Sequence, residues 1–176
     1  MKKYIYILLN VIFISVSIIP LSNAQTAPTT NATLQFGNLT ATNQTGNLTA
    51  TTQTSILMGT AQADILNGTP GDDFIYGGAG FDNITGNQGN DEIDGGVGGD
   101  NIVGGDGDDL IFGGIGNDNI SGGDGNDDLY GGPGADFLDG GRGADYFDCG
   151  DSSDTIANLN ISEGDIAMAN CEKMAR

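Results

Sequence analysis

Aspartate recurs every nine residues from position 64 onward, and it is the residue type in this chain with the clearest chemical use. Carboxylates at a fixed spacing offer oxygen ligands to a hard cation, or acid pairs for proton transfer. The spacing holds through ten repeats from Gly59 to Asp148 and through an eleventh, degraded copy, CGDSSDTIA, from Cys149 to Ala157. The candidate ligands are Asp64, Asp73, Asp82, Asp91, Asp100, Asp109, Asp118, Asp127, Asp136, Asp145 and Asp154.

Each aspartate stands at position six of the same nine-residue unit. Glycine opens the first ten units and recurs at positions two and four, where it can adopt φ > 0. An apolar residue always follows the aspartate two positions later. A strict period of this kind indicates one small structural unit stacked on copies of itself.

The best-formed units, GGAGFDNIT, GGIGNDNIS and GGDGNDDLY, resemble the calcium-binding nonapeptide G-G-x-G-x-D-x-U-x of the repeats-in-toxin (RTX) family. The resemblance implies an all-β fold, a right-handed parallel β-roll of about five turns with two nonapeptides in each. Positions one to six would form a turn, and positions seven to nine a strand with residue eight pointing inward. It also implies that backbone carbonyls complete the calcium sites, at Gly77, Gly95, Gly104, Gly113, Gly122 and Gly131.

A turn of two nonapeptides sorts the repeats into two columns with different outer faces. Odd-numbered repeats place Asn83, Asn101 and Asn119 one above another as an asparagine ladder. Even-numbered repeats expose a set of aromatic residues, namely Phe74, Tyr76, Phe112, Tyr130 and Tyr146. This difference is not needed by the nine-residue motif, so it is separate support for the roll.

The charge of the chain favours a cation between the rungs. The 176 residues include 24 acidic and 5 basic residues, no His and 2 Cys, which gives a net charge of −19. Stacked carboxylates about 5 Å apart repel by roughly 3 kcal/mol at the effective dielectric of a protein surface. Calcium–oxygen distances of about 2.3–2.6 Å span this gap, whereas magnesium prefers shorter bonds and zinc prefers His or Cys. We therefore predict several calcium ions, at most about nine.

The repeat block is expected to fold only when calcium binds. Its single row of inward apolar side chains buries too little surface to offset the entropy of ordering the chain. The alternative is an acidic, glycine-rich linker that is disordered under all conditions. A linker has no reason to keep aspartate and apolar residue in phase, so we expect coupled folding and binding.

Residues 1–24 have the pattern of an export signal. Lys2 and Lys3 precede an apolar run, and Ser22-Asn23-Ala24 resembles a cleavage site. The alternative is an uncleaved membrane anchor, which the polar residues and Pro20 within the run disfavour. We expect a secreted or cell-surface protein without a membrane span after cleavage. Typical RTX exoproteins carry a C-terminal signal instead, which argues against a toxin.

Residues 25–58 are predicted to be a linker of low complexity. The segment has no charge, is rich in Thr and Asn, and contains the near-duplicates GNLTATNQT and GNLTATTQT, which lack the aspartate. A flexible, disordered stalk is the simpler interpretation. A second interpretation uses its Asn-x-Ser/Thr sequons as glycosylation acceptors, at Asn31, Asn38, Asn43 and Asn47.

The repeat block is predicted to span residues 59–157, and residues 158–176 are expected to cap its C-terminal end. Cys149 and Cys171 are expected to form a disulfide that pins this tail, because two cysteines in an exported chain usually pair. Closing such a loop would contribute about 3 kcal/mol. Two free thiols are the alternative.

The residue inventory argues against an enzyme. The chain has no His and no Ser in a nucleophile-elbow setting, and acid pairs such as Asp72/Asp73 belong to the repeat and have no cleft. The negative charge disfavours nucleic acid.

The leading functional hypothesis is an extracellular calcium-binding repeat protein with a structural or adhesive role. The alternative is a module that binds a cell-surface glycan, a protein partner or a second copy through the aromatic face. A remote alternative is a C-terminal module related to secreted hydrolases or toxins. Ice binding would need a flat Thr array, and the outward residues are too mixed for that.

Overall fold

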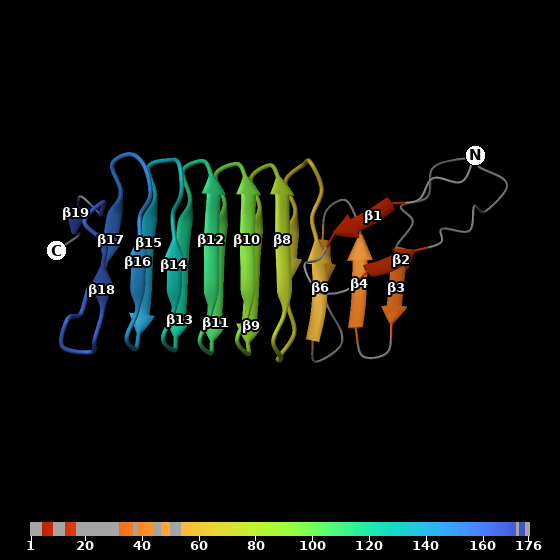
Figure 1. Ribbon diagram of the computed structural model, residues 1–176, viewed down its shortest axis with the longest axis horizontal. Coiled ribbons are helices and arrows are strands. Elements are labelled where there is room, and N and C mark those ends of the chain that lie inside the picture. Colours follow the sequence, from red (N-terminus) through yellow and green to blue (C-terminus); the bar gives the residue numbers. More distant parts are fainter. Residues whose placement is uncertain are drawn as a thin grey trace, which may run out of the picture.

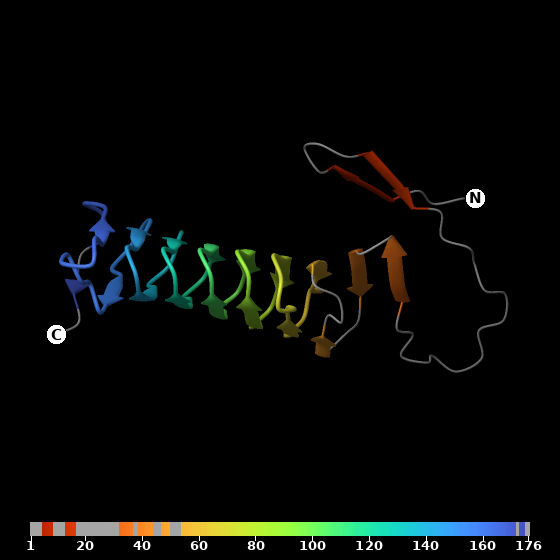
Figure 2. The same ribbon diagram turned by 90° about the horizontal axis from the view of Figure 1, so that it is seen from below.

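The chain forms a long, straight solenoid of short β-strands (Figures 1 and 2). It was analysed as a computed structural model. The structure describes residues 5–8, 13–16, 32–36, 39–43, 47–49, 54–171 and 173–174. None of these residues is in a helix long and apolar enough to cross a membrane. The predicted export signal lies largely outside the described residues; within it, β1 (Ile5–Leu8) pairs antiparallel with β2 (Phe13–Val16).

Two sheets form the walls of the solenoid, and the chain alternates between them. In sheet order, the first contains β18 (Ile166–Ala167), β16 (Tyr146–Asp148), β14 (Asp128–Tyr130), β12 (Leu110–Ile115), β10 (Glu92–Val97), β8 (Phe74–Ala79), β6 (Thr54–Met58), β4 (Leu39–Asn43) and β3 (Ala32–Phe36). The second contains β19 (Lys173–Met174), β17 (Thr155–Ala157), β15 (Phe137–Arg142), β13 (Asn119–Asp124), β11 (Asn101–Asp106), β9 (Asn83–Gln88), β7 (Ile65–Asn67) and β5 (Asn47–Thr49).

The strand register confirms the predicted parallel β-roll. Ile93 of β10 pairs with Ile75 of β8 and with Ile111 of β12, so the chain returns to the same place after two nonapeptides. All the neighbouring strands from β4 to β19 pair in parallel within each sheet. The roll has about six turns, one more than expected.

Most central strands are longer than the predicted three residues. β8 runs from Phe74 through the glycine pair to Ala79, which is position three of the next repeat. Gly78 has φ of 105° and still pairs with Gly96 one rung along. The glycine pair was expected to belong to the turn, but its backbone continues the ladder because every rung bends at the same position.

The N-terminal boundary of the roll also differs from the expected one. β6 lies within the predicted linker, and it places Ser55 and Leu57 at positions six and eight of an additional unit. Leu57 is completely buried at the end of the core. The repeat therefore continues in phase through residues 54–58, with serine where the other units have aspartate.

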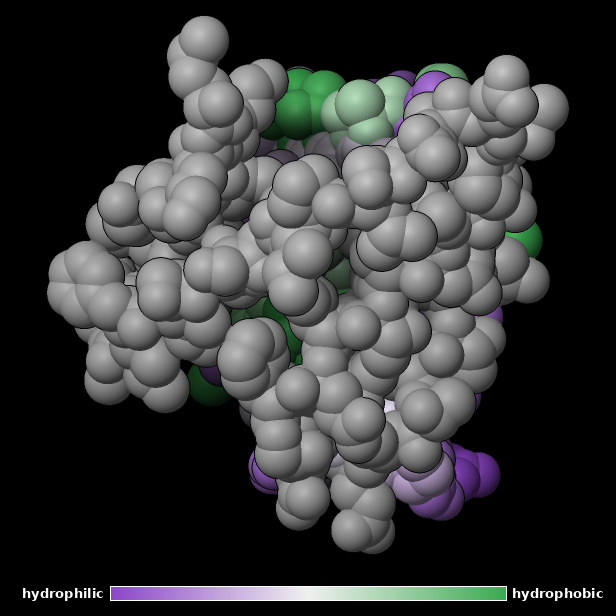
Figure 3. Space-filling view, turned by 90° about the vertical axis from the view of Figure 1, so that its right-hand side faces the viewer, coloured by the Kyte–Doolittle hydropathy of each residue, from purple (hydrophilic) through white to green (hydrophobic). Residues whose placement is uncertain are grey.

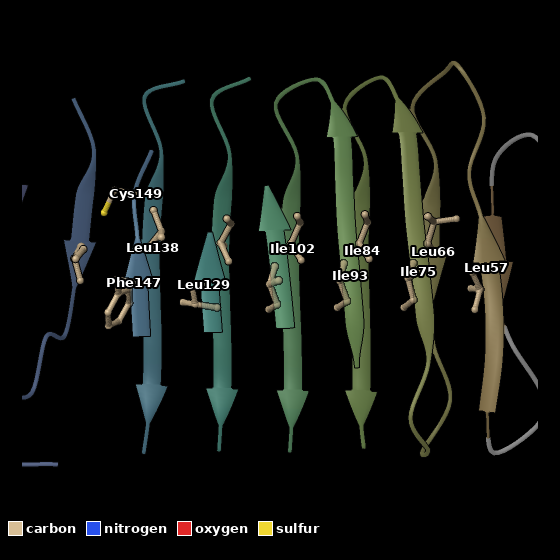
Figure 4. Close-up of a cluster of buried hydrophobic side chains, with 13 residues drawn as sticks. Leu57, Leu66, Ile75, Ile84, Ile93, Ile102, Leu129, Leu138, Phe147 and Cys149 are labelled. Atoms are coloured by element: carbon tan, nitrogen blue, oxygen red, sulfur yellow. The ribbon is translucent and has the colours of Figure 1, made fainter. Parts of the chain in front are cut away.

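A single row of apolar side chains fills the space between the sheets (Figure 4). Each comes from position eight of a repeat, and neighbouring rungs stack them at the spacing of the strands. The row consists of Leu57, Leu66, Ile75, Ile84, Ile93, Ile102, Ile111, Ile120, Leu129, Leu138, Phe147 and Ile156, joined by Cys149.

The C-terminal tail completes the roll as a cap. Cys149 and Cys171 form the predicted disulfide, with their Cα atoms 5.1 Å apart. Between them, β18 adds another rung, in which Ala167 pairs with Phe147. The tail thus continues the strand ladder as well as covering its end.

Candidate metal centre

The eleven predicted aspartates lie inside the turns in two columns, and all are at least 95% buried. Burial at this depth is unusual for a carboxylate without a charged partner. Basic side chains do not provide such a partner. Between described residues, the only ion pair joins Arg142 to Asp124, on the exposed surface. The partners of these aspartates therefore decide what the turns can bind.

One oxygen of each aspartate from Asp82 to Asp154 links two rungs of the roll. The Oδ1 atom of Asp82 accepts a hydrogen bond of 2.8 Å from the backbone N–H of Asp64, one rung before it. The same bond, at 2.8–3.0 Å, recurs along both columns as far as Asp154. These bonds bring successive rungs together at the position where their charges would repel.

The second oxygen has no hydrogen-bond partner in nine of the aspartates. These Oδ2 atoms are buried, and a buried carboxylate oxygen without a partner is strongly destabilising. The nine residues are Asp82, Asp91, Asp100, Asp109, Asp118, Asp127, Asp136, Asp145 and Asp154.

The first two repeats differ, because protein donors reach their Oδ2 atoms. Thr60 donates from its backbone N–H and its hydroxyl to Asp64, at 2.6 and 2.8 Å. Thr69 donates from the same two groups to Asp73. Ser55 supplies two further donors to the Oδ1 atom of Asp73.

A backbone carbonyl lies near the unpartnered oxygen of the seven aspartates from Asp82 to Asp136. The point where a Cβ on Gly77 would lie is 2.8 Å from the Oδ2 atom of Asp82 and 2.4 Å from the carbonyl oxygen of Gly95. Only glycine at position one leaves room for both oxygens to converge. The predicted carbonyls of Gly77, Gly95, Gly104, Gly113, Gly122 and Gly131 all lie in this relation to an aspartate of the preceding rung.

The same geometry identifies three carbonyls that the sequence analysis did not name, those of Gly86, Gly140 and Cys149. The first two stand at position one of their repeats and could have been found by that rule alone. Cys149 stands at position one of the degraded repeat, so its carbonyl replaces the usual glycine carbonyl beside Asp136.

Burial makes these carboxylates difficult to ionise in the absence of a cation. It raises the pKa of Asp91 and Asp127 to about 7, while hydrogen bonds from the backbone lower it and neighbouring carboxylates raise it further. The same causes raise the pKa to about 6 in Asp100, Asp109, Asp118 and Asp136. The pKa values of Asp82 and Asp145 are also raised, mainly by burial.

The oxygen set fits a hard cation held mainly by the backbone. Among the described residues, no group of three or more acidic, His or Cys side chains comes together at one point. A carboxylate oxygen and a carbonyl oxygen instead meet over the position-one glycines from Gly59 to Gly131. Oxygen ligands of this mixture suit calcium, which accepts carboxylates and carbonyls in flexible geometry.

Two features of the site were missed by the sequence analysis. Asp165 continues a column beyond the last repeat, because its Oδ1 atom accepts from the N–H of Asp145 and its Oδ2 atom from the N–H of Asn160. Its sequence signal is the short string Gly-Asp-Ile at 164–166, which keeps part of the motif.

The second missed feature is another ladder, formed by position five of the even-numbered repeats. The side-chain oxygen of each of these residues accepts from the backbone N–H one rung later, at 2.8–3.0 Å. The acceptors are Asp72, Asn90, Asp108 and Asn126. Their recurrence as Asp or Asn every second repeat was the available signal.

Comparison with protein families agrees with this geometry. The model of the RTX calcium-binding nonapeptide repeat matches four times, at residues 54–84, 67–102, 94–129 and 121–156. No curated protein matches the chain significantly. The matches together cover more than half of the chain, which therefore belongs to the RTX calcium-binding nonapeptide repeat family.

Proposed function

We propose that this chain is an extracellular calcium-binding structural module whose roll folds when calcium binds. The observation that carries the proposal is the set of nine buried Oδ2 atoms that lack a hydrogen-bond partner. A divalent cation would supply the positive charge that nine desolvated carboxylates require, and it would keep them ionised.

The proposed ligands are arranged in the same way from rung to rung. For Asp82 through Asp136, the unpartnered oxygen lies beside the position-one carbonyl of the next rung in the same column. Each aspartate would thus bind the ion through Oδ2 while its Oδ1 atom holds the preceding rung. Binding would therefore join neighbouring rungs directly.

We also propose that the calcium array begins at Asp82. Asp64 and Asp73, which the repeat pattern includes among the ligands, receive donors from Thr60 and Thr69 on the oxygen that the other aspartates leave unpartnered. Their role would be to close the N-terminal end of the array without an ion.

The setting of the module is proposed from the sequence. The export pattern of residues 1–24 and the disulfide both suit an oxidising, extracellular location. The chemistry of the described turns is that of ion binding, and we propose a structural rather than a catalytic role.

A calcium titration followed by far-UV circular dichroism tests the proposal. We expect a weak β signal in excess chelator and a cooperative rise with calcium, which magnesium at the same concentration does not reproduce. A full β signal in excess chelator would contradict folding on calcium, and an equal response to magnesium would contradict the choice of ion.

A second candidate function is contact with a glycan through the outer face of the first sheet. An open groove of about 400 Å³ there is lined by residues that include Phe74, Leu110, Glu92, Asn90 and Asp108. Apolar rings beside amides and carboxylates suit sugar binding. The nearby aromatic column is partly engaged in its own contacts, because Phe112 stacks on Tyr130 at 4.9 Å.

Replacing Phe74 and Leu110 of the groove with Ser, and separately Tyr76, Phe112 and Tyr130 of the aromatic column, tests this candidate. Glycan-array binding or adhesion should fall while the calcium titration stays unchanged. Unchanged binding would reject a contact role for the aromatic face.

A further inference from the structure

The outer surface of the roll is divided into two halves of different charge. Positions three, five, seven and nine of each repeat supply the outward turn and strand residues. In repeats one, three, five, seven and nine, these positions form what we call the neutral half, where Asp139 is the only charged residue. In the even-numbered repeats they form the acidic half, with acids at Asp72, Glu92, Asp94, Asp106, Asp108, Asp124, Asp128 and Asp148.

Exposed apolar side chains follow the same division. All the large hydrophobic residues that are exposed within the repeat block belong to the neutral half: Ile65, Phe81, Val97, Val103, Ile115 and Phe137. Phe81 and Ile115 are the most prominent, at 72% and 58% exposure. Their turns lie at the top edge of the roll in Figure 1. Figure 3 views the roll from its end and shows hydrophobic residues at the top and at both sides, and hydrophilic residues mainly at the bottom.

The polar residues of the neutral half are partly satisfied before any partner arrives. Asn101 donates to Asn83 at 3.2 Å and Asn119 donates to Asn101 at 3.5 Å, so the amides pair along the ladder. Asn117 accepts from the backbone N–H of Ala135. Burying this surface would therefore leave few polar groups without partners, which removes a usual penalty of docking.

We propose that the neutral half is the surface through which two calcium-loaded copies of this chain pair side by side. A chain of net charge −19 repels its copies, and the repulsion is least where both present the neutral half and direct their acidic halves outward. The pair would have two-fold symmetry, with the same patch used by both copies.

The shape and size of the surface support a second copy as the occupant. The roll is straight, and its outward residues repeat at the strand spacing of about 4.8 Å, so an identical ladder matches it rung by rung. Val97 and Ile115 lie on the first sheet and the asparagine ladder lies on the second, so the neutral half bends over the top edge of the roll. Its four outward positions in each of five repeats set an upper limit for the contact, at the lower end of the roughly 20–30 residues a side that standard interfaces use.

Sedimentation equilibrium of the full chain in calcium tests this inference, which rests on the proposed calcium-loaded roll. We expect a monomer–dimer equilibrium, and dimerisation at least about a hundredfold weaker in the double variant Phe81→Asp/Ile115→Asp, because charges would be buried against charges. The matched control, Pro70→Asp/Gln88→Asp, adds the same charge at two exposed position-three residues of the acidic half, and it should dimerise as the parent does.

Circular dichroism on the same samples separates this test from that of the proposed function. A β signal that responds normally to calcium in every variant shows that only the contact has changed. A calcium-loaded parent that stays monomeric at all concentrations would overturn the proposal. A dimer that persists in the Phe81→Asp/Ile115→Asp variant would also overturn it, because the contact would then lie on another surface of the roll.

Discussion

The ends of the roll and its middle differ in the hydrogen bonding of the position-six aspartate. At the N-terminal end, Thr60 and Thr69 donate to the Oδ2 atoms of Asp64 and Asp73, and at the C-terminal end Asn160 donates to Asp165. In the nine repeats between, the corresponding oxygen is buried and has no partner. The motif thus holds two kinds of rung, one closed by hydrogen bonds and one that requires a cation.

The backbone at position two distinguishes the two kinds of rung. In all nine repeats with an unpartnered oxygen, the residue at this position has positive φ, as in Gly78 at 105° and Asn87 at 89°. Thr60 and Thr69 occupy the position in the first two repeats and do not have positive φ, which β-branched residues resist. Their N–H groups point at the aspartate instead.

We infer from this difference that the end rungs stabilise the roll without an ion, whereas the middle rungs bind calcium. End rungs that need no ion can cover the core and limit fraying, as terminal repeats of solenoids do. In the proposed calcium-bound roll, the middle rungs would need calcium because their Oδ2 atoms lack an internal partner, and the roll as a whole would respond to the ion. The predictions below test whether this division holds.

The largest effect is expected from removing a carboxylate in the middle. Asp118→Asn keeps the Oδ1 acceptor but replaces the unpartnered oxygen with an amide, and it should destabilise the calcium-loaded roll by about 3–5 kcal/mol. Calcium titrations should show a higher midpoint and a lower ion count.

The matched end variant is Asp73→Asn. It should weaken hydrogen bonds to Thr69 and lower the thermal midpoint, but leave the number of bound ions unchanged. Equal losses of calcium in both variants would contradict the division between end and middle.

The next effect concerns the disulfide at the C-terminal end. Cys171→Ser should destabilise the roll by about 3 kcal/mol, because the bridge closes a loop with a separation of 22 residues. The loss should be largest at the last rungs, since the Cys149 carbonyl lies beside the Asp136 site. Thermal unfolding in calcium measures it, and an unchanged midpoint would show that the tail does not cap the roll.

A pH dependence of opposite sign is expected with and without calcium. Burial raises the pKa of Asp91 and Asp127 to about 7, so the folded apo chain holds these protons more tightly than the unfolded chain does. Stability without calcium should therefore rise as the pH falls from about 7 toward 4, and be lost as the pH rises through that window.

With calcium present, protons compete with the ion for the same carboxylates. The calcium midpoint should therefore move to higher concentration as the pH falls below about 7. Circular dichroism in chelator and in calcium across this range measures both trends. A midpoint that does not depend on pH would separate these carboxylates from ion binding.

The smallest effect is expected from a substitution that converts an end rung into a calcium-binding rung. Thr69→Gly removes the hydroxyl donor and permits positive φ at position two, so Asp73 should gain an ion. Equilibrium dialysis should then show about one more calcium per chain. Thr85→Val, on the outer strand face, is the control and should leave the count unchanged. If Thr69→Gly also leaves it unchanged, position two does not set the type of rung.

The fold could be predicted from the sequence because the residue types repeat visibly every nine positions. Aspartate at position six and an apolar residue at position eight stay in phase, and the roll and its core row follow from this pattern. The disulfide followed from the presence of two cysteines in a chain with an export pattern. The extra unit at Ser55 and Leu57 was missed because serine replaces the aspartate on which the register was read. The strand length was missed because consecutive glycines were assigned to a turn.

The division among the aspartates could not be predicted from residue type alone. Thr60 and Thr69 occupy position two, where most repeats have glycine, and their role depends on where a backbone N–H points. The same holds for the Cys149 carbonyl, since carbonyl groups leave no mark in a sequence. The threonine contacts lie within one repeat and the Cys149 contact lies between rungs, and in both cases the backbone geometry decides them.

Hydrogen exchange measured by mass spectrometry, with and without calcium, tests the central claim most directly. In excess chelator, amides of residues 77–157 should exchange as in an unfolded chain, because their rungs contain the nine unpartnered oxygens. With calcium the strand amides from β8 to β17 should become protected together. Protection of the same amides in chelator would contradict the claim that calcium completes the middle of the roll.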